Sequence, residues 1–221
     1  MGQINWLAGI SRPDIGFSSG QICRSSEHAT VSDMVAANKL IYHIKNNQSD
    51  IVFPKLKNLE EVYIKVYTDA SYNNLKDGGS QGGHIVFLTD GRNCCPLSWS
   101  STKVRRMVKS ASAAETLALL DGAESAYLQS KVIGEVIHGV RDRPVPVRCV
   151  TDNRNLFDSA HSTIALTDKR LQLEMGIVRE MLSKGEITLE WVTSQDQLSD
   201  VLTKKGASGS LLREIVSRGH F

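Results

Sequence analysis

Two segments of the sequence share one design, an apolar run rich in β-branched residues that ends in Thr-Asp. The first run covers residues 62–69 and ends at Asp69, and the second covers 145–152 and ends at Asp152. This composition favours β-strands. A long segment of helical period lies between the two runs, so we predict that they are parallel neighbours in one sheet, joined by a crossover helix.

Three more strands are predicted from shorter apolar runs. Residues 84–89 and 97–100 flank Asp90-Gly91, a dipeptide suited to the positive φ of a hairpin turn. Together with the first run they predict three antiparallel strands in chain order. A fifth strand is predicted at 187–192, after the second Thr-Asp run.

Helices are predicted between and beside these strands. Ser112 and Glu115 have the spacing of a capping box and open a helix that runs to about residue 132. One face of this helix carries only small residues, so it can lie close to a sheet; these are Ala111, Ala114, Ala118, Gly122 and Ala126. A second helix is predicted from about 168 to 183, ended by Gly185, and a short one through Leu198, Val201 and Leu202.

The order βββ-α-β-α-β-α predicts an α/β fold. We expect a mixed five-stranded sheet flanked by helices, with three antiparallel strands and then two parallel crossovers. Residues 1–58 are predicted to form an N-terminal helical segment, in which Thr30 caps a helix with Met34, Ala37, Ile41 and Ile44 on one face. The main domain is expected at 59–205, followed by a C-terminal tail at 206–221.

The composition indicates how the fold is stabilised and in which compartment the protein is expected. A chain of 221 residues with 41% hydrophobic residues can bury a core without disulfide or metal staples. Its four cysteines include no C-x-x-C, which disfavours a zinc module and favours a reducing compartment. No membrane span or secretion signal is recognised, so we expect a cytoplasmic protein, with the nucleus also open to it.

Four carboxylates are the strongest candidates for chemistry. Asp69 and Asp152 end the two strands, Glu115 lies in the first turn of the helix between them, and Asp200 lies on the last short helix. Each has an ordinary alternative role as a turn, capping or solvated residue. Together, however, they are expected at one edge of the sheet, where they would repel one another unless cations neutralised them. Carboxylate oxygens suit Mg²⁺, and paired ions serve phosphodiester hydrolysis.

The segments that carry these acids resemble the ribonuclease H domain of Ty1/copia-type retrotransposon polyproteins. The resemblance implies a ribonuclease H-like fold, with Asp69, Glu115, Asp152 and Asp200 as a tetrad of catalytic acids and metal ligands. It further implies two Mg²⁺ ions, with Mn²⁺ as a substitute, and cleavage of the RNA strand of an RNA/DNA hybrid. The matching segments are VYTDASY at 66–72, SASAAETLA at 110–118, VTDN at 150–153 and DQLSDVLTK at 196–204.

The N-terminal segment resembles the end of the reverse transcriptase that precedes this domain in the family. Its matching segments are WLA at 6–8, SRPDI at 11–15 and AANKLI at 36–41. The polymerase part of such a polyprotein is therefore an expected partner. No Asp-Asp pair occurs in the sequence, so the polymerase's Tyr-x-Asp-Asp centre is absent from it. The family often has Trp where Tyr72 stands, and an additional acid in the run that here ends at Glu115.

Basic residues precede the predicted helix of Glu115 and are expected to bind nucleic-acid phosphates. They are Lys103, Arg105, Arg106 and Lys109. Ser71, Ser112 and Asn153, which lie beside the acids or one turn from them, are candidate nucleic-acid contacts, with turn and N-cap roles as the alternatives. Lys169-Arg170, Lys204-Lys205 and His161 are weaker candidates, better explained by surface charge, a helix end and a solvated loop.

Other functions compete with the nuclease. A non-catalytic remnant or domesticated fragment would bind nucleic acid or a partner without cleaving. Transposases and integrases order their acids D-D-E, and the related exonucleases place the Glu two residues after the first Asp, so both fit this sequence poorly. The sequence leaves open the oligomeric state and whether the chain acts alone.

Overall fold

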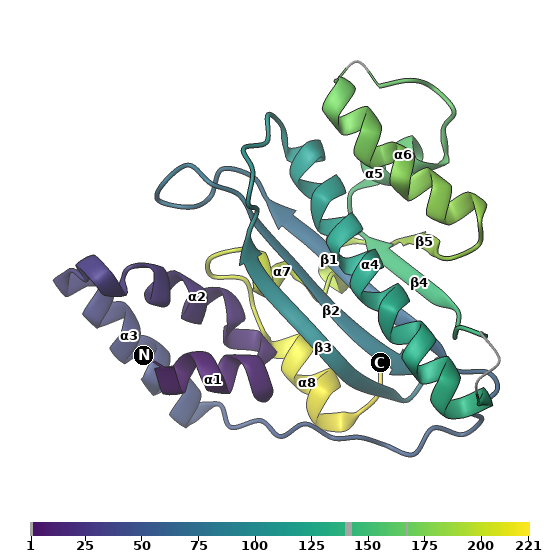
Figure 1. Ribbon diagram of the computed structural model, residues 1–221. Helices are drawn as coiled ribbons and strands as arrows, with labels where there is room; N and C mark the ends of the chain where they lie inside the picture. Colours follow the sequence, from purple (N-terminus) through teal and green to yellow (C-terminus); the bar gives the residue numbers. More distant parts are fainter. Residues whose placement is uncertain (1, 140–142, 167) are drawn as a thin grey trace.

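The sheet has the predicted mixed topology. We describe a computed structural model, in which residues 2–139, 143–166 and 168–221 are placed. Its strand order is β3-β2-β1-β4-β5, antiparallel between β1, β2 and β3 and parallel from β1 through β4 to β5 (Figure 1). The strands are β1 (Tyr63–Ser71), β2 (Gln81–Thr89), β3 (Cys94–Lys103), β4 (Val147–Thr151) and β5 (Thr188–Trp191).

Eight α-helices are assigned in the described residues. They are α1 (Gly2–Ile10), α2 (Gly16–Arg24), α3 (Val31–Asn46), α4 (Ala111–His138), α5 (Arg154–His161), α6 (Lys169–Ser183), α7 (Asp200–Thr203) and α8 (Ser210–Arg218). Short 3-10 helices lie at η1 (Pro13–Ile15), η2 (Ser26–His28) and η3 (Ser194–Asp196). Helix α4 crosses one face of the sheet, with α5 and α6 beside it, whereas α7 and α8 lie on the opposite side (Figure 1).

The alternation of side chains along the strands creates two cores. Ile64 and Val66 of β1 point toward α4, α5 and α6, whereas Tyr67 of the same strand packs with α7 and α8. Helix α4 lies close to β1, as its small residues predict. A Cβ atom built on Gly122 would lie only 2.5 Å from Cγ2 of Thr68. The close approach fixes the position of α4 and therefore of the acid in its second turn.

The hairpin turn and the helix starts show where local signals succeed and fail. Gly91 has a φ of 96°, as predicted for the turn between β2 and β3. Helix α4, however, begins two residues earlier than its proposed capping box. Ser110, not Ser112, is its N-cap and accepts a hydrogen bond from the Ala113 amide. The predicted capping pair of Ser112 and Glu115 is therefore wrong, and Glu115 does not cap α4.

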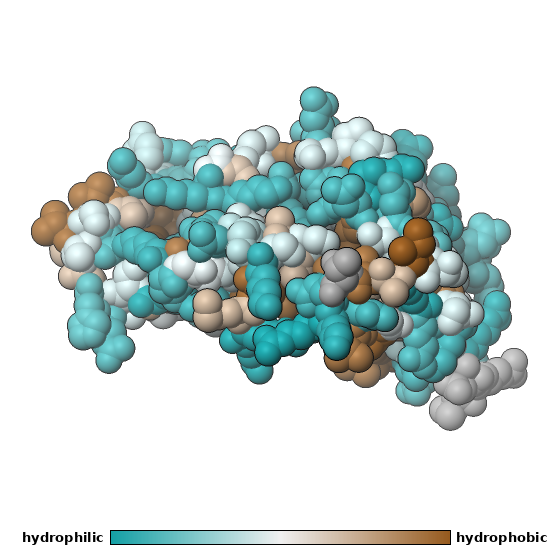
Figure 2. All heavy atoms as spheres, turned by 90° about the horizontal axis from the view of Figure 1, so that it is seen from above, coloured by the Kyte–Doolittle hydropathy of each residue, from teal (hydrophilic) through white to brown (hydrophobic). Residues whose placement is uncertain are grey.

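The N-terminal segment is helical, and Thr30 forms a capping box with Asp33. The predicted apolar face of α3 is only partly right, because Met34 is exposed and Leu40 is the buried residue. Apolar atoms lie exposed at the left end of Figure 2, over these N-terminal helices. The segment is bonded to the sheet, since Trp99 Nε1 of β3 donates to the carbonyl of Ala8 at 2.7 Å.

Residues 206–221, expected as a tail, contain a helix that the sequence analysis did not predict. Leu212, Ile215 and Val216 of α8 are buried in the second core. The Cys94 amide donates to the Gly219 carbonyl at 2.8 Å, which joins the chain end to the start of β3. Residue 205 is thus no boundary of the packed structure. Within the described residues, we find no helix with the length and apolarity that crossing a bilayer requires.

Candidate active site

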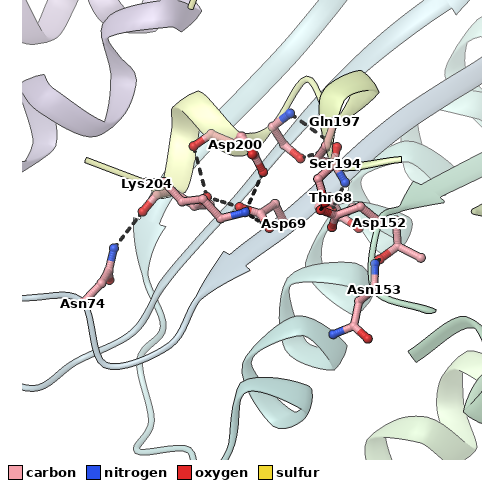
Figure 3. A network of polar contacts seen from close by, with 12 residues as sticks. Thr68, Asp69, Asn74, Asp152, Asn153, Ser194, Gln197, Asp200 and Lys204 are labelled. Carbon is pink, nitrogen blue, oxygen red and sulfur yellow. Dashed lines mark hydrogen bonds and ion pairs between the residues drawn. The ribbon is translucent and has the colours of Figure 1, made fainter. Parts of the chain in front are cut away.

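The parallel pairing of β1 and β4 brings their Thr-Asp ends to one edge of the sheet. Tyr67 is in register with Val150, so Asp69 and Asp152, each two residues farther along the chain, come to the same end of the two strands. Asp152 is held in place from the β5 side. Trp191 Nε1 donates to its backbone carbonyl at 3.0 Å. Ser194 Oγ donates to Oδ2 of Asp152 at 2.7 Å, and both of these residues are labelled in Figure 3.

Asp69 lies at the centre of this edge and is completely buried. Its Oδ2 accepts a hydrogen bond from the Thr203 hydroxyl. Its Oδ1 is buried and accepts no hydrogen bond from any described residue, although Lys204 Nζ lies 3.3 Å away. A buried oxygen without a hydrogen bond is costly, and such atoms in native structures call for an explanation.

Glu115 approaches the same edge from α4. Its side chain is buried, and the nearby amide of Ala70, one residue after Asp69, acts to lower its pKa. The pKa of Glu115 is raised to about 9, mainly by burial and additionally by the charges of Asp69 and Asp152. Without a bound cation, Glu115 is therefore protonated at neutral pH.

The pKa of Asp69 is also raised, to about 6, and burial is the main cause. Lys204 and Thr203 oppose this rise, whereas Asp200 and Asp152 add to it. The four predicted acids are thus near neighbours, because Asp152 and Asp200 act on the pKa of Asp69, and Asp69 and Asp152 act on that of Glu115. They come from β1, α4, the end of β4 and the start of α7.

Lys204 is the residue that sequence reasoning set aside and the structure brings to the centre. Its Nζ lies 2.7 Å from Asp200 Oδ1 and 3.3 Å from Asp69 Oδ1 (Figure 3). Burial alone would lower the pKa of Lys204, but Asp69 and Asp200 raise it above its usual value. The i, i+4 spacing of Asp200 and Lys204 was a signal of their contact.

The segment between β5 and α7 is anchored to β1 by buried polar side chains. Gln197 Nε2 donates to the Thr68 carbonyl at 3.0 Å, and Ser199 Oγ donates to Gln197 Oε1 at 2.9 Å. Asn74 Nδ2, from the turn after β1, donates to the Thr203 carbonyl at 2.8 Å. These bonds hold α7, and therefore Asp200, against the end of β1. None of these three supporting residues was predicted.

The donor set suits a hard divalent cation, since all four acids offer oxygen ligands. As the side chains stand, no three His, Cys, Asp or Glu residues among those described are gathered closely enough to hold a metal ion. The ammonium of Lys204 lies between two of the acids instead. The orphaned Oδ1 of Asp69 is the atom that a cation would satisfy.

The predicted basic residues divide into two groups. Lys103 forms an ion pair with Asp77, and Arg106 forms one with Glu174 of α6. Arg105 is exposed, and Lys109 lines an open hollow with Asp168, Lys169 and Arg170. Two of the four cations are therefore engaged within the chain, which leaves Arg105 and Lys109 for an external phosphate.

The three polar candidates beside the acids have different positions. Asn153 is the N-cap of α5, a helix the sequence analysis missed, and it accepts from the Leu156 amide at 3.0 Å. Ser112 lies inside α4, where its carbonyl accepts from the Thr116 hydroxyl. Ser71 ends β1. His161 contacts the Phe157 carbonyl at the end of α5.

The sequence is similar to two transposon proteins of Arabidopsis thaliana. It is 26% identical over 207 residues to the retrovirus-related Pol polyprotein from transposon RE1, and 23% identical over 205 residues to that from RE2. Each alignment covers 92% of this chain, which spans only 13% and 14% of the relatives' lengths. The resemblance to copia-type Pol polyproteins is thereby confirmed. No family model matches the chain.

Solved structures with a similar fold include ribonuclease H domains. One is the N-terminal RNase H domain of a Mycobacterium tuberculosis protein, with 16% identity and a TM-score of 0.49, covering 64% of this chain and 91% of that one. Another is LC11-RNase H1 in complex with an RNA/DNA hybrid, with 13% identity and a TM-score of 0.49, covering 63% and 93%. A foamy viral protease-reverse transcriptase covers 87% of this chain and 26% of its own, with 12% identity and a TM-score of 0.46.

Proposed function

We propose that this chain is a Mg²⁺-dependent endonuclease that hydrolyses the RNA strand of RNA/DNA hybrids. The observation that carries the proposal is the state of Asp69. It is wholly buried, its Oδ1 accepts no hydrogen bond from the described residues, and three further acids lie around it. Burying such a group costs free energy that folding alone does not require, so we infer that a ligand compensates for it.

Asp69, Glu115, Asp152 and Asp200 would hold the ions. When bound, two divalent cations would activate the attacking water and stabilise the leaving oxygen of the phosphodiester. The chain's own contribution is to hold the carboxylates in position before substrate arrives. Asp69 is fixed by Thr203 and Asp152 by Ser194, whereas Glu115 is held by its place on α4, which packs against β1. Side chains held in this way on strands and helices keep the geometry that such a reaction needs.

The proposed substrate follows from the sequence relatives and from the surface charge. Both relatives are Pol polyproteins of transposons, and they align with nearly the whole chain. Arg105 and Lys109, just before α4, are free to contact phosphates beside the acids. We expect the hybrid to bind more weakly as the salt concentration rises, because cations contact its phosphates. We expect little dependence on base sequence, because contacts to phosphates and 2′-hydroxyls recognise the shape of the duplex and not its bases. The polymerase part of a polyprotein is the proposed partner.

The test is cleavage of a labelled RNA/DNA hybrid by the purified chain with Mg²⁺. Single-stranded RNA and duplex RNA serve as substrate controls. Asp69→Asn removes one carboxylate charge at the site, and Asp158→Asn is the matched control, because Asp158 is exposed on α5 and pairs only with Arg154 among the described residues. We expect hybrid-specific cleavage that Asp69→Asn abolishes and Asp158→Asn leaves unchanged.

Two outcomes would contradict the proposal. Equal cleavage by Asp69→Asn and the unchanged chain would show that the nuclease activity lies elsewhere or comes from a contaminant. Hybrid binding without any metal-dependent cleavage would select the alternative, a non-catalytic fragment that binds nucleic acid.

A further inference from the structure

We propose that Lys204 is a built-in counter-cation of the metal-free site, which has to move away before a divalent cation can bind between Asp69 and Asp200. The inference deepens the proposed function and rests on it for the identity of the ion. It gives a role to a residue outside the acid tetrad.

The position of the ammonium carries the first step. Nζ of Lys204 lies 2.7 Å from Asp200 Oδ1 and 3.3 Å from Asp69 Oδ1, so it stands between the two carboxylates. Asp69 Oδ1 has no hydrogen-bond donor among the described residues. A cation that binds both acids would use these same two oxygens. The ammonium and the ion therefore compete for one position.

The second step is that the acids do not need Lys204 to hold them in place. Asp69 is fixed by the Thr203 hydroxyl through its other oxygen, Oδ2. Asp200 is positioned by α7, which Gln197 and Asn74 attach to the rest of the edge. Removal of the ammonium would thus leave both carboxylates near their present positions.

The third step is that Lys204 is able to leave. It follows the last residue of the short helix α7, and its side chain is 39% exposed, in contrast to the fully buried Asp69. A lysine ammonium stands on a flexible four-carbon stem, so rotation about its side-chain bonds can carry it into solvent without a change of backbone.

The consequence is an exchange of cations. In the metal-free protein, Lys204 reduces the repulsion among the acids and stabilises the fold. When a divalent ion arrives, the ion replaces the ammonium, so part of its binding free energy is used to break the ion pairs of Lys204. The residue should therefore weaken metal binding and strengthen the metal-free fold.

The experiment compares Lys204→Met with Lys205→Met. Both variants lose one positive charge, but Lys205 is exposed and has no ion pair within the part of the chain that the structure describes. Mg²⁺ binding is measured by titration calorimetry, and the unfolding temperature is measured with EDTA and with Mg²⁺. We expect Lys204→Met to bind Mg²⁺ about fivefold more tightly and to unfold at a lower temperature in EDTA only. Lys205→Met should match the unchanged chain in both.

The inference is overturned if Lys204→Met binds Mg²⁺ no more tightly than the unchanged chain, or if it is equally destabilised with EDTA and with Mg²⁺. Either result would mean a purely structural ion pair. Lys204→Arg keeps a positive charge and serves as a second variant, which should retain the stability in EDTA and the weaker Mg²⁺ binding. Unchanged affinity in a chain that cleaves hybrids rejects this inference alone, whereas no Mg²⁺ binding by any variant rejects the proposed function too.

Discussion

Two buried aspartates of this protein, Asp14 and Asp69, differ in how completely their oxygens are bonded. Asp14, in η1, accepts hydrogen bonds from Arg12 Nε and Nη2, both at 2.8 Å, and from Arg213 Nη1 at 3.2 Å. From the residues that the structure describes, Asp69 accepts one hydrogen bond, and its Oδ1 accepts none. Burial raises the pKa of both carboxyls. Arg12 and Arg213 more than reverse this at Asp14, whereas at Asp69 the pKa stays near 6.

The difference separates an acid that holds the fold from an acid that awaits a ligand. The two arginines of Asp14 come from the N-terminal segment and from α8, so this ion cluster joins both ends of the chain. It needs nothing from outside. Among the described residues no arginine pairs with Asp69, and its charged neighbours are other acids and the partly exposed Lys204. Unmet bonding capacity, more than burial, marks the functional carboxylate.

The largest effect that tests this difference between Asp14 and Asp69 is expected from a substitution of Asp69. We expect Asp69→Asn to lower the hybrid cleavage rate well beyond the roughly 10–100-fold that loss of a supporting residue of a metal site typically costs. The same variant should fold at least as well as the unchanged chain, because the buried charge has gone. Cleavage rates and unfolding temperatures, both measured with Mg²⁺ and with EDTA, check this; a large loss of stability would put Asp69 in the same class as Asp14.

The opposite result is expected at Asp14. Asp14→Asn should lower the free energy of unfolding by about 3 kcal/mol, because Arg12 is then buried without its counter-charge. No hydrogen bond or ion pair joins Asp14 to any of the four acids in the described residues, so the folded fraction should cleave at the normal rate. Urea denaturation measures the first effect. Limited proteolysis should release the N-terminal segment more readily from the variant, and equal protection would contradict the proposed role.

Glu115, beside Asp69, and Asp14 should make the stability of the fold depend on pH in opposite directions. Glu115, the partner of Asp69, has a pKa of about 9 in the metal-free fold against an ordinary 4.5, so the folded protein holds a proton that the unfolded chain releases. The stability of the metal-free protein should therefore fall as pH rises between these values. Asp14 contributes stability above its ordinary pKa of 3.8, which is lost as pH falls below that value.

Thermal unfolding in EDTA across this pH range tests the difference. Glu115→Gln should flatten the fall in stability toward high pH, whereas Asp14→Asn should leave that part of the curve unchanged in slope. A steep fall that persists in Glu115→Gln would show that another group causes it.

The smallest expected effect comes from the outer partner of Asp14. Arg213 is more exposed than Arg12 and donates one bond rather than two. Arg213→Met should therefore cost about 1 kcal/mol of unfolding free energy, less than Asp14→Asn. Urea denaturation of both variants ranks them, and a larger loss in Arg213→Met would reverse our account of how the cluster is held.

The sequence could predict the sheet and the four acids because local pattern determines them. Two apolar runs that end in Thr-Asp imply parallel strands, and parallel strands bring Asp69 and Asp152 to one edge. The resemblance added the same four residues. A two-residue error at the start of α4 did no harm, because Glu115 lies on the correct face of the helix whichever serine caps it.

The supporting residues could not be predicted, because their partners are far away in the chain. Thr203, Ser194 and Gln197 act on Asp69, Asp152 and Thr68 across the fold, and no local period records such a contact. Lys204 was misjudged for the same reason. Its spacing from Asp200 was visible, but its approach to Asp69 depends on the packing of α7. Helix α8 was missed because a nine-residue amphipathic stretch is a weak signal by itself.

The bond from Thr203 to Asp69 joins residues that are 134 positions apart. During synthesis on the ribosome, β1, β2 and β3 can pair as soon as they emerge, since their contacts are between neighbours in the chain. Asp200 and its supporting residues emerge much later and close the site last. The order of translation thus keeps the growing polypeptide without its complete set of acids until nearly the whole fold has formed.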